Sequence, residues 1–147
     1  MNDLTNFTLK FNSSFDTVEE FYNNSSQLKY FGTEIKFMNN NLVVVKIPNI
    51  SSVHLGGSGT TSINGAIISF LFDLALGLTA YLVEDNKFNL SVTSRINIQF
   101  KKPLYGNEII VYSKINNVKK NLIYSEAWVK DDSKIICAKA NGILFTK

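Results

Sequence analysis

Apolar and polar positions first follow a helical spacing over residues 14–24, where Asp16 and Glu19 stand in the positions of a capping box. This segment is predicted to be a short surface helix. From residue 28 to 47 the period becomes that of strands. Alternating residues up to 37 and the β-branched run Leu42–Ile47, separated by asparagines, predict a hairpin.

The longest apolar run, Ala66–Val83, follows a glycine-rich loop and predicts a long helix. Its length of about 18 residues would suffice to cross a bilayer. Asp73 near its middle and the lack of flanking Lys or Arg favour instead a helix buried in a soluble protein, with no membrane partner.

The remaining chain alternates between strand-like runs and turn-forming clusters. The predicted strands are Ser91–Phe100, Glu108–Ile115, Asn121–Val129 and Lys134–Phe145. A helix, a hairpin, a long helix and a meander predict an α+β fold with one antiparallel sheet packed on one central helix. The whole chain, 1–147, is expected to form a single domain in which 1–27 is an N-terminal extension.

Composition narrows the function classes. The chain has 147 residues with 45% hydrophobic content, and its net charge of +3 is too small to indicate nucleic acid but is compatible with small anionic ligands. A single cysteine, Cys137, and a single histidine, His54, exclude an internal disulfide and predict no metal site. The N-terminus lacks the layout of a signal peptide, so a cytoplasmic location is expected.

The predicted central helix is apolar on nearly all sides, so we expect it to be buried on most faces. The exceptions fall at steps of three or four and form one stripe of small or polar residues, which are Ala66, Ser69, Asp73, Gly77 and Ala80. Such a stripe allows close approach by a second subunit or by a ligand.

Asp73 is the main chemical feature of this helix. A buried carboxylate costs free energy unless it is paired, and burial raises its pKa toward the range of a general base. A structural Asp that accepts a hydrogen bond from a neighbouring hydroxyl or amide is an equally good interpretation of the helix alone.

The start of the helix is a second candidate site. Asn64 is a good N-cap, and Gly65 leaves free backbone N–H groups accessible, which could stabilise the oxyanion of acyl transfer. Asp73 lies roughly 13 Å along the helix axis from the cap residue Asn64. One chain's Asp73 therefore cannot serve its own helix terminus, whereas a symmetric dimer could bring Asp73 of one chain to Gly65 of the other.

These residues resemble a known signature. Asn64-Gly65-Ala66, Ser69-Phe70-Leu71-Phe72-Asp73, a strand ending in Lys101-Lys102-Pro103, and the turn Gly106-Asn107-Glu108 follow the order and spacing of PaaI-type hotdog acyl-CoA thioesterases. The resemblance covers about residues 28–146. It implies a hotdog fold, a homodimer or a dimer of dimers with sites at subunit interfaces, an acyl-CoA substrate and no cofactor beyond the CoA of that substrate.

The resemblance also implies roles for residues. Asp73 would activate water or attack the thioester, the Gly65 amide would polarise its carbonyl, and Thr93 would help to position the water. Lys102 and Lys120 would meet the CoA phosphates. Independently of the resemblance, Ala66 and Ser69 on the small-residue stripe and His54 in the loop before the helix are expected to contact the substrate.

Three positions depart from the family pattern: Asn64 replaces a His, Ala66 replaces a Gly, and Ser58 replaces an Asn that orients water. Asn64 and Ser58 are still candidate catalytic residues. The departures leave open a non-catalytic protein that binds acyl-CoA or fatty-acyl groups. A hydratase is disfavoured because its chemistry requires a His paired with an acid.

Three other sequence features give weaker evidence of function. A Ser-His-Asp triad around His54 is disfavoured because the chain has no nucleophile elbow, so a loop histidine near a pocket mouth is the simpler interpretation. The glycine-rich loop 56–61 lacks the Lys-Ser/Thr ending of a phosphate loop. Alternation places Thr93, Arg95, Asn97 and Gln99 on one face of a strand, which we interpret as solvated except at Thr93.

Overall fold

The computed structural model of the chain describes residues 9–39, 41–56 and 60–147. The element order is α1 (Phe15–Asn23), α2 (Ser26–Phe31), β1 (Glu34–Met38), β2 (Leu42–Ile47), the 3-10 turn η1 (Ser52–His54), α3 (Gly65–Leu78), the 3-10 turn η2 (Thr79–Leu82), β3 (Ser91–Phe100), β4 (Ile109–Lys119), β5 (Leu122–Lys130) and β6 (Ile136–Thr146).

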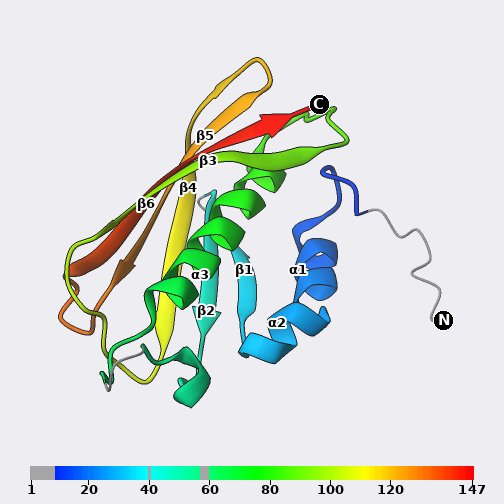
Figure 1. The fold of residues 1–147 in the computed structure, drawn as a ribbon. Helices are drawn as coiled ribbons and strands as arrows, with labels where there is room; N and C mark the ends of the chain where they lie inside the picture. Colours follow the sequence, from blue (N-terminus) through cyan, green and yellow to red (C-terminus); the bar gives the residue numbers. More distant parts are fainter. Residues whose placement is uncertain (1–8, 40, 57–59) are drawn as a thin grey trace.

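The six strands form one antiparallel sheet in the order β1-β2-β4-β5-β6-β3. The sheet curves around α3, which lies along its concave face, while α1 and α2 lie beside β1 (Figure 1). A long helix wrapped by an antiparallel sheet is the hotdog fold. The predicted fold class is therefore confirmed.

Strand alternation explains how the core is built. One side of every strand faces α3, so Val43, Val45 and Ile47 of β2 are fully buried against helix residues such as Leu71 and Phe72. At Gly142 of β6 the helix approaches so closely that a Cβ atom would lie 2.9 Å from Cδ1 of Leu76. A larger residue there would push the helix away from the sheet.

Buried hydroxyls end the central helix. Ser113 Oγ donates to the Ala75 carbonyl at 2.7 Å, and Thr79 Oγ1 donates to the Leu76 carbonyl at 2.6 Å while also bonding Ser125 Oγ at 2.7 Å. Carbonyls in the last turn of a helix need such partners when they are buried. The predicted helix 66–83 is thus an α-helix to Leu78 followed by one 3-10 turn to Leu82.

Two expectations at the N-terminus are wrong. The N-cap of α1 is Ser14, whose Oγ accepts from Thr17 N, rather than Asp16, and Glu19 binds strand β1 instead of closing a capping box. Residues 28–31 are helical rather than strand-like. Ser25 caps α2 and Gly32, at φ +60°, ends it, so local capping overrides the alternation in this segment.

A β-bulge in β3 corrects a further expectation. The register with β6 shifts between Thr93 and Arg95, so Thr93 faces α3 while Arg95, Asn97 and Gln99 face the outer side of the sheet. These four residues do not share a face, because the extra residue Ser94 reverses the alternation. The bulge also brings Thr93 to the helix.

The helical segment Gly65–Leu82 has 18 residues and a mean hydropathy of 1.8, which would suit a membrane span by length and composition alone. It lies against the sheet with 56% of the segment buried. The core helix of a globular domain passes the same test.

Candidate functional site

Some backbone amides at the start of α3 donate hydrogen bonds to Asn64, and another has no acceptor among the described residues. Asn64 Oδ1 accepts from Ala66 N at 2.8 Å, and the Asn64 carbonyl accepts from Ile67 N at 3.0 Å. The N–H of Gly65 has no acceptor among the residues that the structure describes. Asn64 therefore completes the helix cap and leaves one polarised amide, that of Gly65, free to bind a negative charge.

A groove of about 300 Å³ lies beside Gly65 at the start of α3. Gly65 and Ile68 of α3 line it together with Phe100 and the segment that follows β3 up to Leu104. The Phe100 side chain is 55% exposed, and its ring would lie 3.6 Å from a Cβ placed on Gly65. Phe100 is a site residue that the pattern analysis missed, although its position two residues before Lys102-Pro103 was a usable signal.

Asp73 accepts a hydrogen bond from Thr93. Thr93 Oγ1 donates to Asp73 Oδ1 at 2.7 Å, which joins α3 to the edge strand β3. The expectation that Asp73 is buried is wrong for the single chain, where the side chain is exposed. The reason is that α3 packs on the sheet with its apolar side and turns its stripe of small residues outward, where a Cβ placed on Gly77 would meet open space.

Ser69 lies between the two features on the same stripe and is half-buried. Its Oγ donates to the Gly65 carbonyl at 2.8 Å, one turn back along the helix. Ala66 is exposed beside it, whereas Ala80, at the far end of the predicted stripe, is buried within η2. The exposed stripe thus runs from Ala66 to Gly77.

The two lysines assigned to CoA phosphates lie far apart within one chain. Lys102 follows β3 beside Cys137 at the start of β6, and Lys120 lies in the turn before β5, near Phe145 at the end of β6. Eight residues of strand separate these levels, or roughly 26 Å. One chain therefore cannot place both ammonium groups on one phosphate cluster.

Lys102 is also engaged. Its Nζ donates to Asp131 Oδ2 at 2.5 Å, and Asp131 Oδ1 accepts from Ile135 N at 2.9 Å. The hydrogen bond from Lys102 lowers the pKa of Asp131, and the same bond raises the pKa of Lys102. This pair anchors the segment after β3 to the β5–β6 turn.

His54 is buried, with only 3% of its surface exposed, rather than lying at a pocket mouth. Its Nδ1 accepts from Ser51 N at 2.9 Å, so Nε2 carries the proton and donates to the Phe31 carbonyl at 2.9 Å. Nε2 thus joins η1 to the end of α2, while Nδ1 holds the backbone of Ser51 just before η1. This placement is structural and offers no free ring nitrogen to a substrate.

Ser58 lies outside the described residues. Within 9–39, 41–56 and 60–147, no group of three or more His, Cys, Asp or Glu side chains could hold a metal ion. Within the described residues the candidate groups are the Gly65 amide, the Asp73 carboxylate and the Thr93 hydroxyl. These are the kinds of group that general acid–base catalysis and oxyanion stabilisation require.

Comparison with known families decides the relationship. The pattern of the thioesterase superfamily matches residues 61–138, more than half of the chain, and this stretch includes Gly65, Asp73 and Thr93. The chain belongs to the thioesterase superfamily. Thioester hydrolysis is therefore the activity class. The matched stretch begins after the N-terminal helices α1 and α2. Comparison with curated protein sequences returned no significant match.

Solved structures show the same fold at low identity. A thioesterase from Haemophilus influenzae is 12% identical with a TM-score of 0.77, over 92% of this chain and 91% of that one. The PaaI protein from the phenylacetic acid degradation operon of E. coli is 18% identical with a TM-score of 0.72, over 90% and 91%. A mutant thioesterase from Staphylococcus aureus is 18% identical with a TM-score of 0.71, over 84% and 99%. The expected resemblance to PaaI-type hotdog proteins is confirmed.

Proposed function

We propose that this protein hydrolyses an acyl-CoA thioester to the free acid and CoA, in the cytoplasm, at a site shared by the two chains of a homodimer. The observation that carries the proposal is that α3 presents two different chemical groups at separate positions along its length. The amide of Gly65, which has no acceptor in the described part of the chain, and the carboxylate of the exposed stripe lie on the same element, and Thr93 donates a hydrogen bond to that carboxylate.

The chemistry follows from these groups. Thr93 occupies Oδ1 of Asp73, so Oδ2 is available to take a proton from water as the water oxygen attacks the thioester carbonyl. The N–H of Gly65 then stabilises the oxyanion. The C–S bond breaks, and the leaving thiolate takes the proton back from Asp73, which gives the acid and CoA.

The dimer follows from distance. Gly65 and Asp73 are eight residues apart on α3, about 12 Å along its axis, which is too far for one thioester. A twofold axis beside Ser69, midway between them, would bring each Asp73 to the Gly65 of the other chain. The strand β3, which lies along the helix from Thr93 near Asp73 to Phe100 near Gly65, has a free edge available for pairing about the same axis.

Gly65 offers a clean test of the oxyanion donor. Gly65 is the first residue of α3, where proline is tolerated because its missing N–H has no helical partner, and Asn64 has the extended backbone that precedes a proline. Gly65→Pro should keep the fold and lower kcat by about 10²–10³-fold. Gly65→Ala keeps the N–H and is the matched control, because its Cβ would make only ordinary contact with Phe100.

Asp73→Asn tests the base. The variant should remain folded and lose hydrolysis of a chromogenic acyl-CoA panel by about 10²–10⁴-fold, while Asp132→Asn, at an exposed acid in the β5–β6 turn, should leave it unchanged. Unchanged turnover in Asp73→Asn would rule out the mechanism. Saturable binding of acyl-CoA by the wild-type protein with no release of CoA would instead identify the non-catalytic binding protein.

A further inference from the structure

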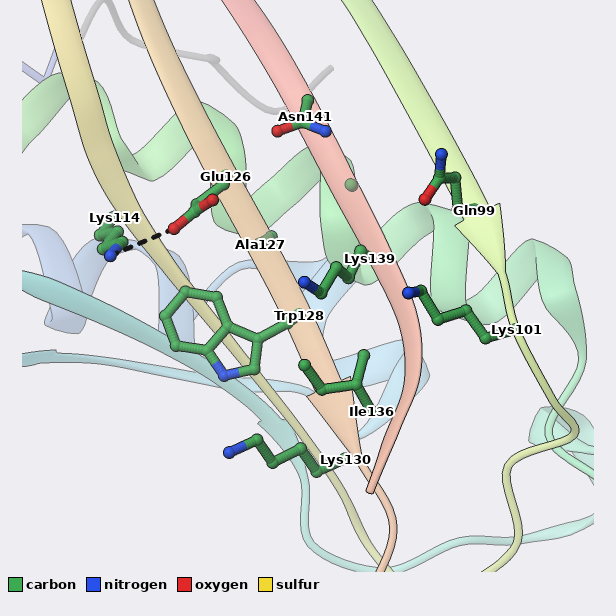
Figure 2. Close-up of a pocket in the computed structure, with 11 residues that line it drawn as sticks. Gln99, Lys101, Lys114, Glu126, Ala127, Trp128, Lys130, Ile136, Lys139 and Asn141 are labelled. Atoms are coloured by element: carbon green, nitrogen blue, oxygen red, sulfur yellow. Dashed lines mark ion pairs between the residues drawn. The ribbon is translucent and has the colours of Figure 1, made fainter. Parts of the chain in front are cut away.

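The outer face of the sheet, opposite α3, carries a hollow of about 490 Å³ that the thioester chemistry does not use. Figure 2 shows its lining, in which the indole of Trp128 extends from β5 toward β4, while Lys139 and Lys101 lie toward β6 and the end of β3. Cross-strand register aligns one row of outward side chains over four strands, in the order Tyr112, Trp128, Lys139 and Gln99. The hollow is therefore built by regular pairing in the middle of the sheet rather than by a loop.

One aromatic side chain, Trp128, lines this hollow. The ring of Trp128 stacks on that of Tyr112 with centroids 5.9 Å apart and planes 20° apart. The Lys114 ammonium lies 5.9 Å from the Trp128 ring centroid and pairs with Glu126 at 3.1 Å. Lys114 and Glu126, the one acid of the lining, thus neutralise each other and hold the indole ring in place.

The rim is basic and unpaired. Lys101, Lys130 and Lys139 line the hollow, and none of them has an acidic or hydrogen-bonded partner for its ammonium group within the described part of the chain. In Figure 2 the Lys139 side chain lies between Trp128 and Lys101, and Lys130 lies past the indole toward the end of β5. The amides of Gln99 and Asn141 complete the lining.

We propose that this outer-face hollow binds a phosphorylated nucleotide. A planar base stacks well on an aromatic side chain, lysine ammonium groups bind phosphates as point charges, and amide side chains can bond the edges of a base. A hollow with all three kinds of group matches a ligand that is aromatic at one end and polyanionic at the other. The ligand is either a free nucleotide or the nucleotide end of CoA, which share this chemistry.

Lys101 makes the second source geometrically possible. It lines both the outer hollow and the groove beside Gly65, since it follows β3 at the sheet edge where the two faces meet. A CoA molecule would then pass around this edge from the thioester site. Only this source rests on the hydrolytic function proposed above; the nucleotide site stands on the outer-face residues alone.

Trp128 is the single tryptophan of the chain, so its fluorescence reports on the hollow directly. The wild-type protein is titrated with adenosine 3′,5′-bisphosphate, ADP, adenosine and inorganic pyrophosphate, with free N-acetyltryptophanamide as the correction for absorbed light. The two phosphorylated nucleotides should quench Trp128 saturably. Adenosine should bind about tenfold more weakly or worse, because it lacks the charged partners of the lysines.

The double variant Lys130→Ala/Lys139→Ala, at two lysines that line the outer hollow but not the groove beside Gly65, should weaken nucleotide binding by about tenfold or more. Lys87→Ala, at an exposed lysine before β3, is the matched control and should change nothing. Absence of saturable quenching, or quenching that the double variant retains in full, would overturn the proposal. So would a second copy covering this face, seen as a lower assembly mass for Trp128→Glu together with no nucleotide binding by the wild type.

Steady-state hydrolysis separates the two sources. If CoA is the occupant, the double variant should raise KM for acyl-CoA by a similar factor with kcat unchanged, and adenosine 3′,5′-bisphosphate should compete with the substrate. If a free nucleotide is the occupant, KM should not change although quenching is lost. Because the fluorescence titration needs no turnover, failure of the hydrolytic proposal leaves this result readable.

Discussion

At one edge of the sheet, β1 lies beside α1, and side chains of that helix bind its outward backbone groups. Asn23 Oδ1 accepts from Ile35 N at 2.7 Å while Asn23 Nδ2 donates to the Ile35 carbonyl at 3.1 Å, and Glu19 Oε1 accepts from Phe37 N at 2.7 Å. At the other edge, β3 pairs with β6 alone, and no other strand of the described chain lies along its free side.

The difference teaches how this fold directs assembly. An edge strand exposes unpaired N–H and C=O groups that any other strand can bind, so proteins cover the edges that must stay single. Here the N-terminal helix supplies that cover for β1 with two polar side chains. The longer strand β3 is left open next to Asp73, which makes it the edge that a second copy can use.

The largest expected effect comes from Asn97→Lys at the open edge. In the proposed dimer this position lies close to the twofold axis, so the change places two lysines near each other and opposes pairing. The mass by light scattering should fall to that of one chain. Hydrolysis should fall by about 100-fold, since a single chain cannot bring its own Gly65 and Asp73 together.

The control for that experiment is Asn117→Lys, the same substitution at an exposed position of the interior strand β4. It should change neither mass nor turnover. A single-chain mass for Asn97→Lys with full hydrolysis would show that the site is complete in one chain. The open edge at β3 would then not be needed for activity.

Asn23→Ala tests the covered edge. It removes both hydrogen bonds to Ile35, leaving two backbone groups of β1 without their partners, and should lower the free energy of unfolding by about 1–3 kcal/mol in urea titrations. kcat/KM at moderate temperature should be nearly unchanged, because β1 lies at the opposite edge of the sheet from β3. Asn24→Ala, next to it but bonded only within α1, should cost less.

Glu19→Ala should have a smaller effect, about 1 kcal/mol, because it removes one acceptor from Phe37 N. Glu19→Gln keeps an acceptor oxygen on a side chain of the same length, so it should restore most of the lost stability. Equal destabilisation by both variants would mean that the carboxylate charge, rather than the hydrogen bond, holds α1 on β1.

The smallest effect concerns the anchor at the end of the open edge, the Lys102–Asp131 pair. Because the pKa of Asp131 is lowered in the folded chain, its contribution is present above the ordinary carboxyl value of 3.8 and is lost as pH falls through the lowered pKa. The raised pKa of Lys102 keeps the pair intact up to pH 10.5 and above, until pH rises through that raised value.

Asp131→Asn should therefore lower Tm slightly at pH 7, and the difference from wild type should close as pH is lowered through the carboxyl range. Thermal unfolding followed at pH 7, 4 and 2.5 measures this. Because an amide oxygen can also accept from Ile135 N, a difference that is independent of pH would assign the effect to packing rather than to the carboxylate charge.

Local patterns were sufficient wherever one element's own residues decide its structure. Strand Ser91–Phe100 was predicted with the bounds that the structure has, and the hairpin and central helix were found within a few residues. Local patterns failed at α2, a six-residue helix that begins after the cap Ser25 and ends at Gly32. Its apolar residues also fit the alternation of a strand. The patterns failed again at the bulge in β3, because a single extra residue reverses every later side chain without changing the composition.

By itself, the sequence determined the α+β order, the long apolar helix, the Asn64–Gly65 helix start and the acid nine residues after the cap, since all of these depend on residues near one another in the chain. The tertiary structure alone decided which groups meet. It brought Thr93 to Asp73, engaged Lys102 with Asp131, and placed α1 on one edge of the sheet while leaving the other open. Contacts between residues distant in sequence depend on register and packing direction, and a one-residue shift changes both.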